Sequence, residues 1–133
     1  MSVANDAFIA ERAREQAHRA AIEASVQELA QELEDVLSRR LTAYLVNVQE
    51  GRTIARWATG EITTIRDAET ERRLRVAFEI VRMLREASAA TQTIRAWFIS
   101  LNPRLNNQPP LEVIRNGKLN EALYAAEAFV ANP

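Results

Sequence analysis

Apolar residues recur along this chain at three- and four-residue spacing, which is the pattern of amphipathic helices. The first clear run lies between residues 26 and 37, a longer one between 67 and 86, and further runs at 94–99 and 119–130. The buried positions that this spacing predicts are Val26, Leu29, Leu33, Val36 and Leu37; Leu74, Ala77, Phe78, Ile80, Val81 and Leu84; and Leu119, Ala122, Leu123, Ala126, Phe129 and Val130. The chain is rich in Ala, Glu, Arg and Leu, with only 3 Gly and 4 Pro. Pattern and composition together predict an all-α fold.

The N-terminal region, residues 1–37, has high helix propensity but few large apolar side chains before residue 26. Phe8, Ile9 and Ile22 are the only ones between residues 6 and 24, so we expect a partly exposed helical arm that frays or pairs with another chain. Ser25 and Glu28 have the Ser-x-x-Glu spacing of a capping box, which predicts a new helix at that point. A single helix from about residue 6 to 40, with Ser25 on its polar side, fits equally well.

Two short helical segments, within residues 41–46 and 52–60, follow in the middle of the chain. Residues 47–51 separate them, and Gly51 can supply the positive φ of a sharp turn. Gly60 is placed to end the second segment with a left-handed residue. Two brief helices joined by a tight turn are typical of a helix-turn-helix, so residues 38–66 are predicted to be a DNA-binding segment.

Residues 67–133 are expected to form a further helical region. Asp67 is a candidate N-cap for a long helix whose polar side includes Glu79. A break near residues 88–91, a Pro- and Asn-rich loop at 102–110 and Gly117 divide the remainder, and Pro110 is well placed as a first helical residue.

Several classes of site are excluded by composition. The chain has 0 Cys and 1 His, so disulfides, thiolate metal sites and His-based catalytic groups are not expected. His18 is interpreted as an ordinary exposed side chain. No paired carboxylates and no phosphate-binding Gly-rich loop stand out, so we expect no enzyme, cofactor or metal. We find neither a membrane-spanning run nor a leader sequence, and the expected location is the cytoplasm.

Charge is distributed unevenly along the chain although its formal net charge is only -1. Residues 1–37 carry 3 basic and 8 acidic side chains, whereas residues 38–85 carry 10 basic and 6 acidic ones. The excess of arginine therefore coincides with the predicted helix-turn-helix, where phosphate contacts require positive charge.

Candidate DNA-binding residues follow from this arrangement. Arg52, Thr53 and Arg56 lie on the predicted recognition helix, where arginine can bind guanine and threonine a phosphate. Arg39, Arg40 and Arg66 are assigned to phosphate or surface roles. An ordinary solvated helix face is the alternative for Arg52, Thr53 and Arg56. Large aromatic side chains lock small helical domains, so Trp57, Trp97 and Phe98 are predicted core residues.

Two stretches together resemble the Xre/MbcA/ParS-type antitoxins. Gly51 to Gly60, GRTIARWATG, looks like their helix-turn-helix segment. Trp97 to Leu105, WFISLNPRL, followed by Pro109 to Gly117, PPLEVIRNG, is similar to their C-terminal toxin-binding domain. The resemblance runs from about residue 41 to 131, and the second motif is the more specific one.

The resemblance implies an antitoxin of a type II toxin–antitoxin pair, whose partner is a RES-domain toxin that consumes NAD⁺. Such antitoxins cover the toxin's active site with their C-terminal region and repress their own operon. Residues 67–133 would then be the toxin-binding domain, and a homodimer or a hetero-oligomer with the toxin is expected. The implied toxin-binding residues are Asn102, Pro103, Asn106, Asn107, Tyr124, Glu127, Phe129 and Asn132; plain turn residues and a frayed terminal helix are the alternative. A regulator without a toxin partner and a helical scaffold are the other possible functions.

Overall fold

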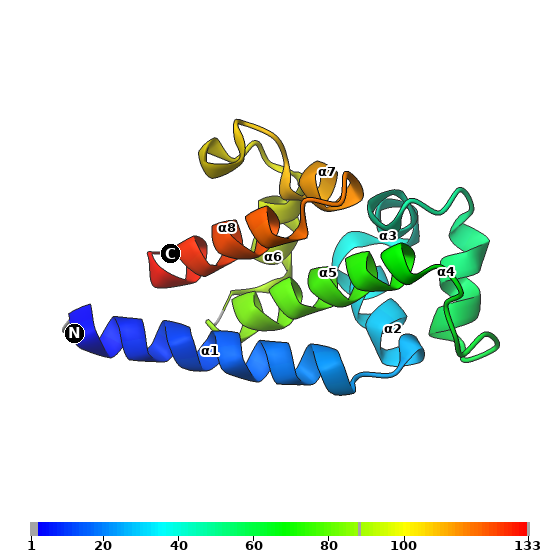
Figure 1. The fold of residues 1–133 in the computed structure, drawn as a ribbon, viewed down its shortest axis with the longest axis horizontal. Coiled ribbons are helices and arrows are strands. Elements are labelled where there is room, and N and C mark those ends of the chain that lie inside the picture. Colours follow the sequence, from blue (N-terminus) through cyan, green and yellow to red (C-terminus); the bar gives the residue numbers. More distant parts are fainter. Residues whose placement is uncertain (1–2, 88, 133) are drawn as a thin grey trace.

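Helices make up the regular structure of this protein, as the pattern predicted. The structure is a computed structural model and describes residues 3–87 and 89–132. Within them lie α1 (Val3–Glu23), α2 (Val26–Leu37), α3 (Arg39–Val46), α4 (Gly51–Ala58), α5 (Ala68–Glu86), α6 (Thr91–Ile99), the 3₁₀ turn η1 (Pro103–Leu105), α7 (Pro110–Arg115) and α8 (Leu119–Ala131) (Figure 1). No strand occurs in these residues, and the all-α prediction is confirmed. None of their helices is both long and apolar enough to cross a membrane.

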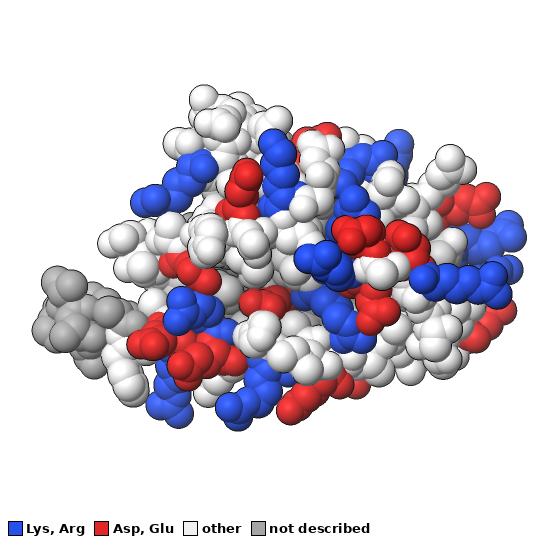
Figure 2. All heavy atoms as spheres, viewed as in Figure 1, with Lys and Arg blue, Asp and Glu red and all other residues white. Residues whose placement is uncertain are grey.

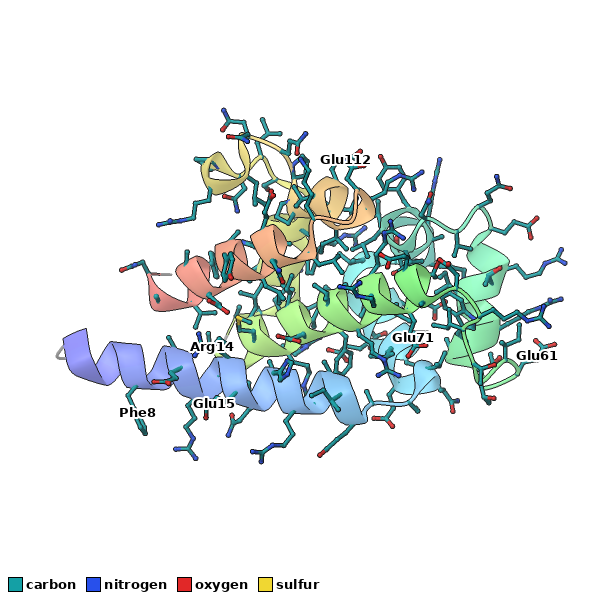
Figure 3. All side chains as sticks on the ribbon, in the orientation of Figure 1. Phe8, Arg14, Glu15, Glu61, Glu71 and Glu112 are labelled. Atoms are coloured by element: carbon teal, nitrogen blue, oxygen red, sulfur yellow. The ribbon has the colours of Figure 1, made fainter. Side chains whose placement is uncertain are left out.

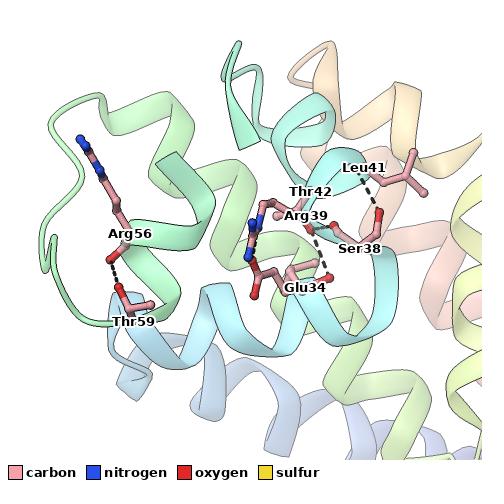
Figure 4. Close-up of polar contacts among 8 residues, drawn as sticks. Glu34, Ser38, Arg39, Leu41, Thr42, Arg56 and Thr59 are labelled. Carbon is pink, nitrogen blue, oxygen red and sulfur yellow. Dashed lines mark hydrogen bonds and ion pairs between the residues drawn. The ribbon is translucent and has the colours of Figure 1, made fainter. Parts of the chain in front are cut away.

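Polar caps set the helix boundaries near the N-terminus. The Ser25 hydroxyl oxygen accepts from the Glu28 N–H at 3.1 Å, so a new helix begins there and the single long helix is excluded. Ser38 separates α2 from α3 with a backbone of φ 82° and ψ 161°, a region that side chains other than glycine rarely adopt. Its oxygen accepts from the Leu41 N–H, and Thr42 donates its hydroxyl to the Ser38 and Leu33 carbonyls at 2.7 and 3.1 Å (Figure 4).

Helix α5 is the centre of the molecule. It contacts α1, α2, α3, α6, α7 and α8, and Figure 1 shows it running through the middle of the fold. Its buried side chains include the predicted face, namely Leu74, Ala77, Phe78, Ile80, Val81 and Leu84. Asp67 caps it as expected, because its Oδ2 accepts from both the N–H and the hydroxyl of Thr70.

Among the described side chains, the inner face of α1 consists of small residues; the side chain of Ile9 lies outside the described ones. Ala13, Ala17 and Ala21 are buried, whereas Phe8 and Ile22 are 61% and 65% exposed. This face packs along α5 and reaches α8. Alanine lets two helix backbones approach closely, so α1 forms part of the common core. The segment is helical and partly exposed as expected, but its inner face packs more firmly than its few large apolar residues predicted.

Polar bonds also attach α1 to α5. The Arg75 guanidinium donates to the carbonyls of Ala21 and Ala24, both at 2.9 Å, which satisfies the end of α1. His18 Nδ1 lies 3.1 Å from Glu79 Oε1. Glu79 was expected on the polar side of α5 but is 9% exposed, because α1 covers it. The His18 side chain is exposed as predicted, but it has a partner.

Aromatic packing closes the C-terminal half of the core. Trp97 and Phe98 meet edge to face with ring centroids 5.2 Å apart, and both are buried, as is Trp57. Pro110 is the first residue of α7, and Gly117 ends that helix with φ 82°. These predictions are confirmed.

Candidate nucleic-acid and partner-binding surfaces

The turn between α3 and α4 is built on Asn47. Asn47 has φ 64°, and the N–H groups of Asn47 and Val48 donate to the Tyr44 and Ala43 carbonyls at 3.2 and 2.9 Å. Gly51 was expected to supply the positive φ, and this prediction is wrong, since it is the first residue of α4. A Cβ at Gly51 would lie 3.1 Å from Arg39 Cγ, so a side chain at this position would require Arg39 to shift by a few tenths of an ångström.

One face of α4 is fixed to α2. Ile54, Trp57 and Ala58 are buried, and the amide nitrogens of Gln27 and Gln31 donate to the Ala58 carbonyl at 3.3 and 2.8 Å. Gly60 follows with φ 81°, as predicted for a residue that ends this helix. The helix is therefore held by its apolar face and its C-terminal end, which leaves its other face in solvent.

The solvent face of α4 is basic. Arg52 and Arg56 are exposed and lie one helical turn apart, while Thr53 beside them is half-buried. Arg56 Nε is 3.7 Å from Glu61 Oε2. Glu61 lies in the segment that follows α4 (Figure 3). The structure thus brings these three predicted residues together on one short helix.

The other predicted DNA-binding arginines are more dispersed. Arg39 Nε donates to Glu34 Oε2 at 2.8 Å (Figure 4). Arg40 is exposed on α3. Arg66 is exposed in the segment before α5. Basic groups project at the α4 end of the molecule, with acidic groups among them (Figure 2). Arg39 already has a carboxylate partner, which weakens its case as a phosphate contact.

A polar junction connects α3 with α7. The Arg115 guanidinium lies over the Tyr44 ring, 4.1 Å from its centroid, and donates to the Tyr44 carbonyl. The Tyr44 hydroxyl donates to Glu112, which raises the pKa of Tyr44 above its ordinary value of 10.0 because the hydrogen bond favours the neutral phenol. Sequence analysis assigned no role to these residues. Tyr44 lies about 70 positions from Glu112 and Arg115 in the sequence, so no local pattern marked the contact.

The loop after α6 is fixed by Asn102. Its side-chain oxygen accepts from the Arg104 N–H at 2.9 Å, and its backbone N–H donates to the Gln108 carbonyl at 3.2 Å. Leu105 is buried beneath the loop, while Asn106 and Asn107 are exposed with φ 55° and 62°. The Asn-Pro-Arg-Leu segment, residues 102–105, therefore has a clear structural role in holding this loop.

A cleft of about 480 Å³ lies between this loop and α8. Trp97, Leu101, Asn102, Pro103, Phe129 and Asn132 are among the residues that line it. Four of the predicted toxin-binding residues, Asn102, Pro103, Phe129 and Asn132, are thus brought together. Leu101, which sequence analysis did not select, is 70% exposed at the cleft, and its position beside the motif was the only available signal.

The remaining predicted toxin-binding residues do not line this cleft. Tyr124 is 66% exposed on α8, and Glu127 Oε2 is 3.8 Å from Arg14 on α1. Asn106 and Asn107 lie further along the loop. The inner side of α8, with Leu119, Ala122 and Val130, belongs to the core, so only its outer face and its end are accessible.

Comparisons with family models, with curated proteins and with solved structures find no match to this chain.

Proposed function

We propose that this protein is a DNA-binding antitoxin that binds operator DNA through α4 and blocks a RES-domain toxin through its C-terminal surface. The observation that carries the proposal is the two-sided character of α4. Ile54 and Trp57 fix one side, and Arg52 and Arg56 are presented on the other. A short helix that is held from behind and basic in front has the form needed to enter a major groove.

The arginines of α4 are available for such binding. Arg56 has an ion pair with Glu61, but both side chains are exposed, at 44% and 64%. An exposed pair of this kind contributes about 0–1 kcal/mol, so a phosphate or a guanine can replace the carboxylate. Arg40 and Arg66 are exposed and would contribute phosphate contacts at the margins of the interface.

The DNA-binding part is tested with the double variant Arg52→Ala/Arg56→Ala on the promoter of the protein's own operon. Arg95→Ala/Lys118→Ala is the matched control, because it removes the same charge from exposed positions on α6 and before α8. Fluorescence anisotropy should show binding roughly tenfold weaker or more for each arginine lost from α4. Equal affinity of the two double variants would exclude α4 as the recognition helix.

The toxin-binding part acts by occlusion, without chemistry in this chain. Since the inner side of α8 is in the core, the helix cannot enter the toxin's NAD⁺ pocket as a whole. The accessible surface is the cleft with Leu101 and Phe129, together with Tyr124 and Asn132 on the outer side and end of α8. If the toxin binds this surface with the rim of its active site, the antitoxin covers the toxin's NAD⁺ pocket and excludes NAD⁺.

Co-expression with a RES-domain toxin encoded beside the gene tests this. Wild-type protein should restore growth, and Leu101→Asp or Tyr124→Asp should abolish the rescue because each places a charge in the contact. Gln92→Asp adds the same charge at an exposed position at the other end of α6 and should rescue fully. If both contact variants rescue as well as the control, the surface is assigned wrongly. Operator binding without any rescue would indicate a stand-alone regulator, and neither activity would indicate a scaffold.

A further inference from the structure

The outward face of α1 carries two large apolar residues, Phe8 and Ile22, that the core does not use. Phe8, Glu15 and Ile22 are spaced by seven residues and, with Arg12 and Arg19, lie opposite the buried Ala13, Ala17 and Ala21. Figure 1 shows α1 along one edge of the molecule, and in Figure 3 Phe8 and Glu15 lie on the side away from α5. The face is thus open from residue 8 to residue 22.

We propose that this face binds a second copy of the chain, with the two α1 helices antiparallel and a twofold axis near Glu15. Phe8 of each copy then meets Ile22 of the other, because both lie seven residues from the centre. Glu11 of each copy meets Arg19 of the other, because both lie four residues from the centre. The contact does not depend on DNA or toxin binding.

Charge favours the antiparallel arrangement over a parallel one. Parallel helices place every residue against its own copy, so Glu11 would face Glu11 and Arg19 would face Arg19. In the antiparallel arrangement Glu11 of each copy meets Arg19 of the other. The two Glu15 side chains then face each other at the axis, and each has the partner's Arg12 and Arg19 about one turn away on either side. Glu11 also approaches Arg14 of its own helix at 3.9 Å, and among the described side chains Arg12, Glu15 and Arg19 form no ion pair.

The shape of the face fits the same register. A shallow hollow of about 400 Å³ is lined by Phe8, Glu11, Arg12 and Glu15, where the partner's Ile22 would lie. The contact from residue 8 to residue 22 is about 21 Å long. A contact along one helix pair of this length is small beside the roughly 1,200–2,000 Å² of stable interfaces, so we expect a weak dimer that dissociates at micromolar concentrations.

Sedimentation equilibrium of the full chain between about 5 and 500 μM tests the proposal. Wild-type protein should dimerise across this range. Phe8→Ser/Ile22→Ser should remain a monomer with unchanged helix content, since both residues are exposed, whereas Tyr124→Ser removes an equally exposed aromatic ring from α8 and should dimerise normally. A monomeric wild type, or a dimer that survives the double substitution, overturns the proposal.

Charge exchange tests the register. Glu11→Arg and Arg19→Glu should each weaken dimerisation about tenfold, since each brings like charges together at both ends. The double variant Glu11→Arg/Arg19→Glu should restore it, because the opposite charges meet again. Single variants that dimerise as well as the wild type would exclude the antiparallel register.

The orientation has a direct test because the chain contains 0 Cys. Under oxidation, a mixture of Glu11→Cys and Arg19→Cys proteins should form a disulfide-linked heterodimer that neither protein forms alone. Disulfide formation within each single variant, and none between them, would demonstrate the parallel arrangement and overturn the proposal.

Discussion

Single polar side chains fix the helix ends of this protein, and Asp67 is the clearest case. Its carboxylate accepts hydrogen bonds from the hydroxyl and the backbone N–H of Thr70, which lower the pKa of Asp67 below its ordinary value of 3.8. The charge of Arg73 lowers this pKa further, whereas desolvation raises it. The charged form is therefore favoured in the folded protein. A group of this kind adds stability above its unfolded pKa, and the stability is lost as the pH falls through its folded pKa.

This gives a pH-dependent prediction. Asp67→Asn keeps an acceptor for the cap but does not titrate. The wild type should be the more stable protein at neutral pH, and the difference in melting temperature should shrink as the pH falls below about 4. Thermal unfolding followed by circular dichroism at a series of pH values measures it. A difference that stays constant with pH would show that the carboxylate charge contributes nothing to the cap.

Residue-scale features differed in how well the sequence predicted them. Ser25 and Asp67 act through hydrogen bonds to residues three positions away, and Pro110 acts through its own fixed φ, so their local patterns sufficed. Ser38 and Asn47 have positive φ although neither is glycine, and Gly51 does not. Their conformations depend on how α2, α3 and α4 pack, which a local pattern does not contain.

The elements pack by different rules in the two halves of the fold. Large side chains fill the space between α5, α6 and α8, whereas α1 lies on α5 through alanines. A search for large apolar residues at helical spacing therefore finds α5 and overlooks the inner face of α1. It also leaves Phe8 and Ile22 unexplained by the core, since they face outward.

Ala17→Leu should destabilise the protein because Ala17 is 1% exposed and α5 lies against it. Overpacking of this kind costs about 1–3 kcal/mol. Urea unfolding monitored by tryptophan fluorescence gives the change in free energy. Gln16→Leu introduces the same side chain at the neighbouring exposed position and should cost far less. Equal stability of the two variants would mean that α1 does not pack closely on α5.

At the scale of the whole molecule, one core runs from Ala13 on α1 to Val130 on α8. Most helices were predictable one by one, although the sequence left open whether α1 and α2 were a single helix. The local Asn102 loop was predictable as well. The cleft was only partly predictable, since Leu101 and Phe129 meet through tertiary packing. The same holds for the Tyr44–Arg115–Glu112 junction, because its residues come from α3 and α7.

Removal of residues 119–133 should therefore unfold the protein and not only detach a binding tail. Leu119, Ala122, Ala126 and Val130 leave the core with this segment. Differential scanning calorimetry should show no cooperative transition for the truncated chain. A normal transition would mean that α8 is dispensable for folding.

The unequal enclosure of α5 and α4 has a consequence for their dynamics. Six other helices contact α5, so its amide hydrogens should exchange with solvent only when the entire protein unfolds. Helix α4 touches α2 and α3 on one side, and its amides should exchange through a smaller, local opening. Hydrogen–deuterium exchange resolved by residue can compare the two. A DNA ligand bound at α4 should slow exchange there while leaving the rates in α5 almost unchanged.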